Sequence, residues 1–171
     1  MSTVLTGAEI RHLINQKPSL VAGFVNLEEQ LQANGFDLTL RDIAVPGTPG
    51  QVVADSSQRR VSELKPLTFE AAGQIDLSPG AYVITFNEVV SLPVDVMALA
   101  TPRSSLLRCS VSVHTAVWDA GYHGRSQALL VVYNPLGFRL QKGARVIQLV
   151  FFRLTTATEG YRGAYQGENT A

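Results

Sequence analysis

Hydrophobic and polar positions alternate with a period of two along most of the chain, in short runs separated by glycine, proline and asparagine. Such runs are typical of half-buried β-strands, because successive side chains of a strand point to opposite faces. Turn signals stand between them at Asn34 and Gly35, at residues 46–50 and at residues 77–80. The spacing predicts an all-β sandwich or barrel. The expected strands cover residues 36–40, 81–86, 89–92, 94–100, 128–132, 137–140 and 144–154, with further short strands within 51–70.

A short helix is predicted near the N-terminus. Thr6 and Glu9 have the spacing of a capping box, in which the threonine hydroxyl accepts the amide of residue 9 and the glutamate side chain reaches back. Three apolar residues then fall on one helical face before Pro18 ends the segment, because the residue before a proline avoids helical dihedral angles. No other helix is predicted.

Two later segments depart from simple alternation. Residues 128–132 are apolar at every position, which predicts a strand buried on both faces. Residues 155–171 are rich in threonine, glycine and asparagine, and such a tail is expected to be mobile unless a ligand or a neighbour holds it. We therefore expect a β-barrel domain over residues 1–154 and a flexible tail over residues 155–171 that acts as a lid.

Composition narrows the class of protein. The chain has 171 residues, enough for one domain with a real core, and 46% of them are hydrophobic. Basic and acidic residues balance at 14 each, and the absence of a basic excess or stripe argues against nucleic-acid binding. No apolar run reaches membrane-spanning length, and no signal peptide is evident. The lone Cys109 excludes an internal disulfide and fits a reducing cytoplasm.

The segment after residue 101 carries a cluster of hydrogen-bond donors. Arg103 brings a planar fork that matches phosphate oxygens, and Ser104 and Ser105 add hydroxyl donors in the same turn. The cluster predicts an anion site. A plain surface turn with a solvated arginine is the alternative, because short motifs match by chance.

Asp119 stands alone as an acid in this region, since no Asp or Glu follows it before Glu159. A carboxylate on a β-turn can hold and deprotonate a water molecule beside a phosphorus atom. Tyr122 follows three residues later and can pack its ring on a sugar. The alternative is an Asx-turn with a purely structural role, because aspartate with a glycine two residues later is a common turn composition.

Two further polar residues interrupt apolar strands. Asp37 can orient a water on a metal ion or anchor the barrel through backbone bonds. Gln148 needs partners if it is buried, and a ligand phosphate or a neighbouring backbone would both serve. His114 is expected to be a hairpin residue near the site and not a metal ligand, because the three histidines lack metal-ligand spacing.

Taken together, these segments resemble the dUTPase and dCTP deaminase superfamily over nearly the whole chain. Single motifs of this length are weak, but five in the right order are strong. Residues 117–124 resemble the dUTPase motif V-I-D-x-x-Y-x-G, residues 102–106 resemble P-R-S-[SG]-L, residues 143–151 resemble G-x-R-I-x-Q-L-x-F, residues 32–38 resemble the deaminase-side Q-P-A-S-x-D-L, and residues 161–167 resemble the tail motif Y…G-K-Y-Q-G.

The resemblance implies a distorted, jelly-roll-like β-barrel subunit and a homotrimer with its sites at subunit interfaces. It implies dUTP as the substrate, with Mg²⁺ held by the triphosphate and water, aided by Asp37. Asp119 takes the place of the general base, and Tyr122 lies under the deoxyribose, where it leaves no room for a 2′-hydroxyl. The other implied substrate contacts are Arg103, Ser104, Ser105, Arg108, His114, Thr115, Ala116, Val117, Gln148, Tyr161 and Gln166.

The choice of reaction depends on one strand position. Deaminases of the family carry a proton-shuttling glutamate there, whereas this chain has Val131 or Leu129, depending on the alignment anchor. A hydrophobic side chain cannot move protons, so a monofunctional dUTP diphosphatase of the dCTP deaminase-like branch is expected. Arg108 also matches the deaminase pattern and Ala164 replaces the tail lysine. A dCTP deaminase, a bifunctional enzyme and a non-catalytic nucleotide-binding relative therefore stay open as alternatives.

Overall fold

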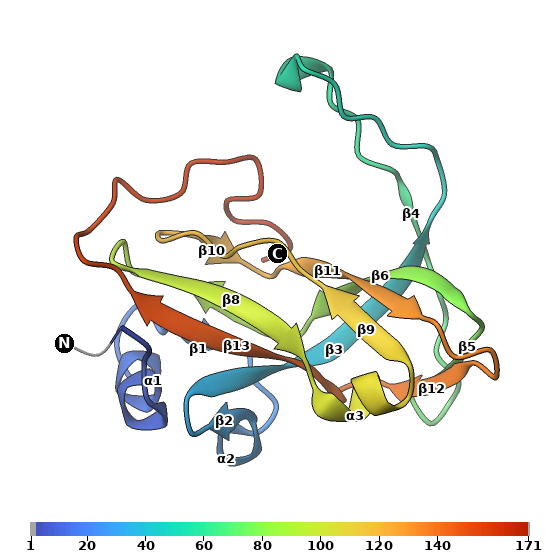
Figure 1. The fold of residues 1–171 in the computed structure, drawn as a ribbon, viewed down its shortest axis with the longest axis horizontal. Helices are drawn as coiled ribbons and strands as arrows, with labels where there is room; N and C mark the ends of the chain where they lie inside the picture. The colour runs from blue at the N-terminus through green and yellow to red at the C-terminus, as the bar shows by residue number, and fades with distance from the viewer. Residues whose placement is uncertain (1–2, 171) are drawn as a thin grey trace.

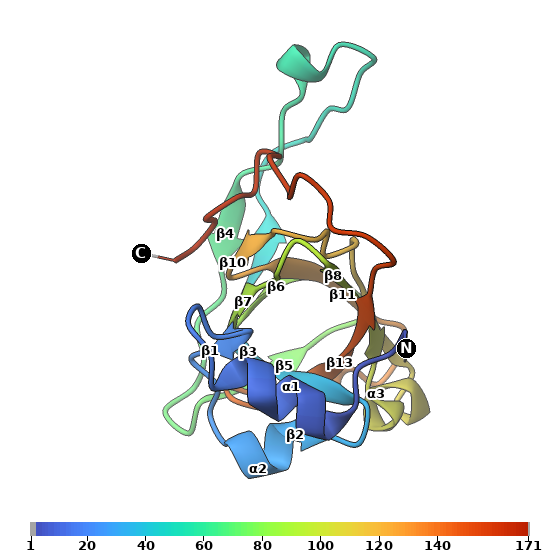
Figure 2. The ribbon, with the colours of Figure 1, turned by 90° about the vertical axis from the view of Figure 1, so that its left-hand side faces the viewer.

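The computed structural model describes residues 3–170, so residues 1, 2 and 171 at the ends of the two predicted segments lie outside the described part. Its main sheet has the strand order β8-β13-β3-β6-β11-β9 and curls into a nearly closed barrel (Figures 1 and 2). A small sheet, β1-β7-β10, and the two-stranded antiparallel sheet β12-β5 complete the body. The strands are β1 Val21–Ala22, β2 Leu31–Gln32, β3 Gly35–Pro46, β4 Leu64–Pro66, β5 Gln74–Leu77, β6 Gly80–Phe86, β7 Val89–Ser91, β8 Val96–Pro102, β9 Val111–His114, β10 His123–Gly124, β11 Gln127–Val132, β12 Phe138–Gln141 and β13 Arg145–Arg153.

Strand β3 is the centre of this barrel. It pairs antiparallel with β13 on one side and with β6 on the other, and each pairing contains a register shift. Such irregularities increase the local bend and twist of a strand, which helps a sheet to close. The first residue of the strand, Gly35, lies so close to β13 that a Cβ there would lie 2.5 Å from the carbonyl oxygen of Leu149, so only glycine fits. The predicted all-β barrel is thereby confirmed.

The core fills the interior of this ring. Phe36, Phe86 and Phe151 are fully buried, together with leucines and isoleucines from β3, β6, β11 and β13. Each fully buried side chain of this size stabilises the fold by about 1.5–3 kcal/mol. Among residues 3–170 no helix is long and apolar enough to cross a membrane.

The N-terminal helix is confirmed as α1, Gly7–Ile14, with both bonds of the Thr6–Glu9 capping box present. The expectation that it is the only helix is wrong. Two further short helices occur, α2 (Leu27–Gln30) and α3 (Ser104–Arg108), as well as a 3₁₀ turn over Ser56–Gln58. The helices α2 and α3 are only four and five residues long, so neither is long enough to show a helical period of hydrophobic residues in the sequence.

The prediction that residues 128–132 are buried on both faces is wrong, because a single chain covers only one face of this strand. Along β11 buried and accessible positions alternate, and the side chain of Leu129 is 41% exposed while Val131 is half-buried. The inner face packs into the barrel, whereas the outer apolar face has no cover from the described residues of the same chain.

A long projection stands between β3 and β4, where several short strands were expected. We call residues 47–63 the arm (Figures 1 and 2). Only β4 in this region is a regular strand, and the arm is held by internal bonds such as those between the backbones of Gln51 and Arg60, at 2.7 and 2.9 Å. Val52 of the arm is 87% exposed to solvent.

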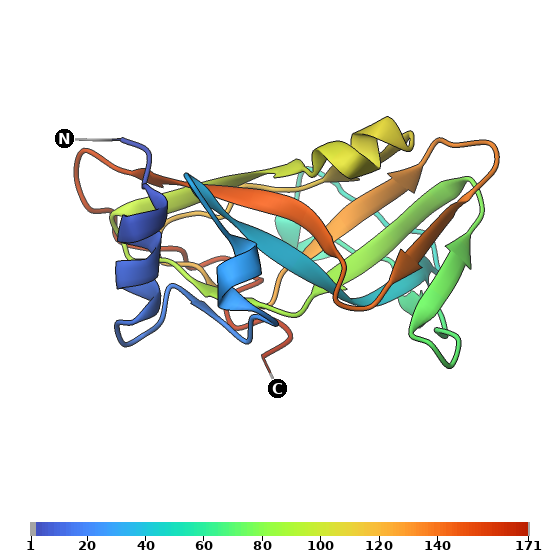
Figure 3. The same ribbon diagram turned by 90° about the horizontal axis from the view of Figure 1, so that it is seen from below.

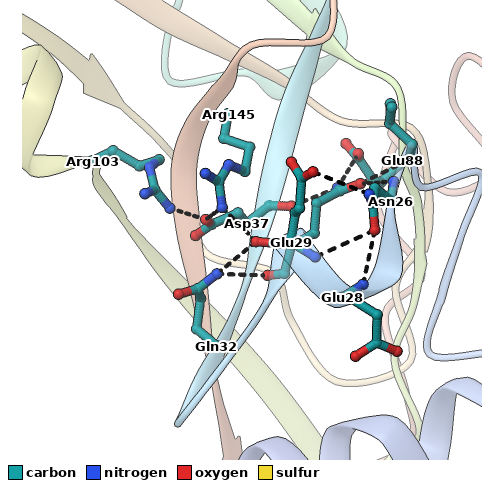
Figure 4. Close-up of polar contacts among 10 residues, drawn as sticks. Asn26, Glu28, Glu29, Gln32, Asp37, Glu88, Arg103 and Arg145 are labelled. Atoms are coloured by element: carbon teal, nitrogen blue, oxygen red, sulfur yellow. Dashed lines mark hydrogen bonds and ion pairs between the residues drawn. The ribbon is translucent and has the colours of Figure 1, made fainter.

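A buried polar network ties α2 and β3 to the segment before β7. The carboxylate of Glu88 accepts hydrogen bonds from the amide of Thr39 at 2.9 Å, from its hydroxyl at 2.6 Å and from Gln30 Nε2 at 2.7 Å. Gln30 in turn accepts the amides of Val25 and Asn26 through its Oε1. Figure 4 shows Glu88 and Asn26 of this network beside Asp37, Arg103 and Arg145.

Replacing Glu88 with glutamine is expected to change how stability depends on pH. Burial raises the pKa of Glu88 above its usual value, and this outweighs the hydrogen bonds from Thr39 and Gln30 that lower it. Between the unfolded and folded pKa values the folded state binds more protons, so the free energy of unfolding falls as the pH rises. Glutamine does not titrate. In urea unfolding between about pH 4 and about pH 8, the Glu88→Gln variant should therefore gain stability relative to the parent as the pH increases. A difference that stays constant over this range would contradict the prediction.

Candidate active site

Asp119 and Tyr122 occupy the two ends of a tight turn that leads into β10. The amide of Tyr122 donates to the carbonyl oxygen of Asp119 at 3.0 Å, and Gly121 adopts a φ of +84° that favours glycine. The preceding Trp118 is fixed to β8 by two backbone bonds with Ala98, at 2.9 and 3.1 Å. Backbone bonds therefore shape this turn, and the side chain of Asp119 is exposed.

The side chains of this turn line a cavity of about 490 Å³. That volume lies within the range of small-molecule sites. Three parts of the chain contribute to it: the barrel, the tail and the arm, which supplies Val61. Its lining consists of Val61, Ala116, Val117, Trp118, Asp119, Tyr122, Ser126, Gln127, Tyr161, Tyr165 and Glu168. None of these lining residues is cationic, whereas two of them are acids.

Tyr122 is buried at the base of this cavity. Its ring meets the ring of Tyr161 edge to face, with centroids 5.8 Å apart, and its hydroxyl donates to Glu168 Oε1 at 2.8 Å. Burial, with Glu168 adding to it, raises the pKa of the Tyr122 phenol far above its usual value, so the hydroxyl stays protonated. Trp118 belongs to the core and also forms part of the cavity wall, with its Nε1 donating to Ser126 Oγ at 3.0 Å.

The tail lies along the outside of this turn (Figures 1 and 2). The side chain of Gln166 accepts the amide of His123 at 3.0 Å and donates to the carbonyl oxygen of Gly121 at 3.1 Å. The amide of Tyr161 donates to the carbonyl oxygen of Ala120 at 2.8 Å. Of these two predicted substrate contacts, Tyr161 lines the cavity, whereas Gln166 binds the turn beside it and is not part of the lining. The flexibility of the tail stays a prediction.

The expectation that Asp119 is the lone acid of the site is wrong. Glu168 lines the same cavity and bonds to Tyr122. Partial burial raises the pKa of the Glu168 carboxyl, and the bond from Tyr122 lowers it less. Four strands, β10 to β13, and most of the tail separate Glu168 from Asp119 in the sequence, so only the path of the tail brings the two acids together.

Asp37 and Arg103 form a second polar centre (Figure 4). The carboxylate of Asp37 is fully buried and pairs through Oδ2 with Arg103, and at 3.5 Å with Arg145. Its other oxygen, Oδ1, has no hydrogen-bond partner among the described residues. Partial burial, with the nearby charge of Arg145 adding to it, lowers the pKa of Arg103. Gln148 stands beside this pair, since it is the strand neighbour of Asp37 and of Thr101.

These two centres do not meet within one chain. Trp118, which precedes Asp119, is bonded to Ala98, whereas Arg103 follows the far end of the same strand, β8. Arg103 comes five positions after Ala98 along this extended segment, which corresponds to about 16 Å. The predicted general base, Asp119, and the predicted phosphate-binding residue, Arg103, therefore lie toward opposite ends of β8.

The remaining predicted residues divide between the two centres. Ala116 and Val117 line the cavity, but His114 and Thr115 do not. His114 is the exposed last residue of β9. The Arg-Ser-Ser segment is the start of α3 and not a plain turn, and Ser104, Ser105 and Arg108 are exposed on that helix, on the Arg103 side.

Metal ligation by the protein alone is not supported. Among residues 3–170, no three side chains of His, Cys, Asp or Glu gather closely enough to hold a metal ion. Asp37 already faces two guanidinium groups. A hard cation such as Mg²⁺ prefers oxygen ligands and commonly uses substrate phosphates with water, so this site fits Mg²⁺ only as a companion of a phosphate ligand.

A larger hollow of about 550 Å³ lies at the opposite end, beside the turns that flank β5 and β12. Its lining is two turns and the exposed ion pair of Asp76 with Arg139. None of the predicted site residues contributes to it, so the site rests on the cavity at Asp119.

Comparison with known proteins agrees with these motifs. A family profile described as dCTP deaminase-like matches residues 4–154. Proteins named probable deoxyuridine 5′-triphosphate nucleotidohydrolase are similar to this chain over nearly its whole length. The one from Methanosarcina mazei is 49% identical, and the match covers 98% of both chains. The one from Archaeoglobus fulgidus is 50% identical, and the match covers 97% of both chains. A solved structure of 2′-deoxycytidine 5′-triphosphate deaminase from Agrobacterium tumefaciens shares the fold, with a TM-score of 0.67 at 24% identity over 88% of this chain and 48% of that chain. The cavity motif, the barrel and these similarities together show that the chain belongs to the dCTP deaminase-like family.

Proposed function

We propose that the protein is a dUTP diphosphatase that hydrolyses dUTP to dUMP and pyrophosphate. The observation that carries the proposal is the exposed carboxylate of Asp119 in a cavity whose base is Tyr122. Relatives about half identical over their whole length carry the name of this activity, which supports the same assignment.

In the proposed reaction, Asp119 accepts a proton from a water molecule whose oxygen attacks the α-phosphorus of dUTP. The bond between this phosphorus and the bridging oxygen to the β-phosphate breaks, and pyrophosphate leaves with that oxygen. Tyr122 packs under the deoxyribose and excludes a 2′-hydroxyl. A positioned general base contributes a factor of about 10²–10⁴ to such a step.

The negative charge of the triphosphate has to be balanced by cationic groups from outside the cavity, because none of the residues that line the cavity is cationic. The Arg103 centre of the same chain lies toward the opposite end of β8, so we propose that a second copy supplies Arg103, Ser104 and Gln148. This arrangement requires a closed oligomer, and we propose a homotrimer with its sites between subunits. The uncovered outer face of β11, with Leu129 and Val131, offers an apolar surface for such contacts.

Mg²⁺ is the proposed cofactor, bound through the triphosphate and water. When bound, it neutralises charge on the phosphate oxygens. Arg103 of the proposed second copy would hold phosphate oxygens with its planar guanidinium group. Asp37 would orient that guanidinium, since it pairs with Arg103 in the structure. We expect the protein to act in the cytoplasm, on nucleotide and not on nucleic acid.

A second candidate function follows from Glu168. The strand positions that would carry a deaminase glutamate are occupied by Leu129 and Val131. However, Glu168 places another carboxyl group in the cavity. If this group moved protons at the pyrimidine ring, dCTP would lose ammonia. Direct measurement can separate this activity from dUTP hydrolysis.

Comparing four nucleotides with Mg²⁺ tests the proposal. We expect pyrophosphate release from dUTP, at least about tenfold slower release from UTP because the 2′-hydroxyl clashes with Tyr122, and no ammonia release from dCTP. Assays of dUTP, dCTP, dTTP and UTP on one preparation would show this. Ammonia release from dCTP would establish a deaminase, and inertness toward all four would favour a non-catalytic nucleotide-binding protein.

A further inference from the structure

The arm contributes to the cavity although it is far from the site motifs in sequence. Its Val61 belongs to the cavity lining, and the rest of the arm extends beyond the barrel (Figure 2). The backbone bonds of the arm are mostly internal, as between Gln51 and Arg60, with Gly47 and Glu63 bonded at its base. Its position beside the cavity must therefore depend on side-chain contacts.

One such contact joins the arm to the tail. The guanidinium carbon of Arg59 lies 5.6 Å from the centroid of the Tyr165 ring. This is the geometry of a cation–π contact, which stabilises by about 0.5–1 kcal/mol at an exposed site. Arg59 has no ion pair with the described residues, so the tyrosine ring is its principal partner.

Tyr165 belongs to a compact turn of the tail. Its amide donates to the hydroxyl of Tyr161 at 3.4 Å, and its carbonyl oxygen accepts the amide of Glu168 at 3.2 Å. Glu168 then accepts the hydroxyl of Tyr122 at 2.8 Å. A continuous chain of contacts thus runs from Arg59 on the arm, through the tail turn, to the base of the cavity.

We infer that Arg59 is a positioning residue that holds the tail turn across the cavity by stacking on Tyr165. The turn is thus held at two points, because the arm contacts it through Arg59 and the barrel contacts it through Tyr122. Arg59 acts through the tail and not on substrate. The effect on tail closure is independent of the reaction, whereas its effect on dUTP affinity rests on the proposed function.

Hydrogen exchange at the amide of Gly167 measures tail opening without any nucleotide. This amide donates to the carbonyl oxygen of His123 at 2.7 Å, so it exchanges only when the tail leaves the barrel. When opening and closing are fast, the exchange rate follows the population of the open form. We expect this amide to exchange about two- to fivefold faster in the Arg59→Ala variant than in the parent, as NMR would show, because one exposed cation–π contact is lost.

Three variants provide matched comparisons. Arg60→Ala removes the same charge from the next arm residue, whose bonds to Gln51 involve only its backbone, and should leave exchange at the Gly167 amide at the parent rate. Tyr165→Phe keeps the aromatic face and should also stay near the parent. Tyr165→Leu should match Arg59→Ala, and the two changes combined should add little, since both remove one contact.

Kinetics provide the functional readout. Arg59→Ala should raise KM for dUTP about two- to fivefold with kcat nearly unchanged, and Arg59→Lys should restore part of the loss because an ammonium group also stacks on an aromatic ring. Equal exchange rates in the parent, Arg59→Ala and Arg60→Ala would overturn the inference, and so would equal acceleration by both alanine variants. Absence of dUTP hydrolysis in the parent would overturn the proposed function instead, while the exchange comparison would still decide the role of Arg59.

Discussion

Replacing Asp119 with asparagine should lower kcat for dUTP by a factor of about 10²–10⁴ while leaving dUTP affinity largely intact. The carboxylate is exposed in the cavity and the turn is held by backbone bonds, so the amide should fit without disturbing the fold. Asparagine keeps the shape but cannot accept the proton of the attacking water. Pyrophosphate release gives kcat, and the fluorescence of Trp118, the one tryptophan of the chain and part of the cavity wall, gives binding.

Two comparisons make this result specific. Asp76→Asn removes an exposed acid at the opposite end of the barrel, where it pairs with Arg139, and should hydrolyse dUTP at the parent rate. Glu168→Gln changes the other acid of the cavity. If Glu168→Gln abolished turnover while Asp119→Asn hydrolysed dUTP normally, the general base would be Glu168 and our assignment would be wrong.

Mixing two inactive variants should restore activity if each site takes its base from one subunit and its arginine from another. In a cyclic oligomer assembled from equal amounts of Asp119→Asn and Arg103→Ala chains, a site is intact only when it receives both native residues. Random assembly gives this combination at about one quarter of the sites, so about one quarter of the parent activity is expected. Each variant alone should retain about 1% or less.

Co-expression of the two chains with different affinity tags would provide the mixed oligomer, and its mass would give the number of subunits. Arg103→Ala also leaves the buried carboxylate of Asp37 with Arg145 as its remaining partner, which costs stability. Arg103→Lys keeps a positive charge beside Asp37 and serves as the second partner in the same experiment. If a mixed oligomer formed from folded variants and showed no recovery, both residues would belong to one site within a chain.

Several features of the fold could be predicted because their signals are local. The Thr6–Glu9 capping box and the turns at residues 46–50 and 77–80 depend on neighbours within a few residues. Period-two alternation likewise predicts the strands that became β3, β6 and β13. The predictions were wrong where an element is very short or where its burial depends on distant neighbours. The helices α2 and α3 are too short to show a helical period, and the burial of the outer face of β11 depends on what packs against it.

The candidate site divides in the same way. The sequence by itself determined the chemical groups, the family they resemble and the prediction that Asp119 and Tyr122 lie together, because these two residues share one turn. Only the tertiary structure placed Val61 and Glu168 in the same cavity, paired Asp37 with Arg103 and separated that pair from Asp119. These relations join residues tens of positions apart, and they depend on how the arm, the tail and β8 pack, which no local pattern records.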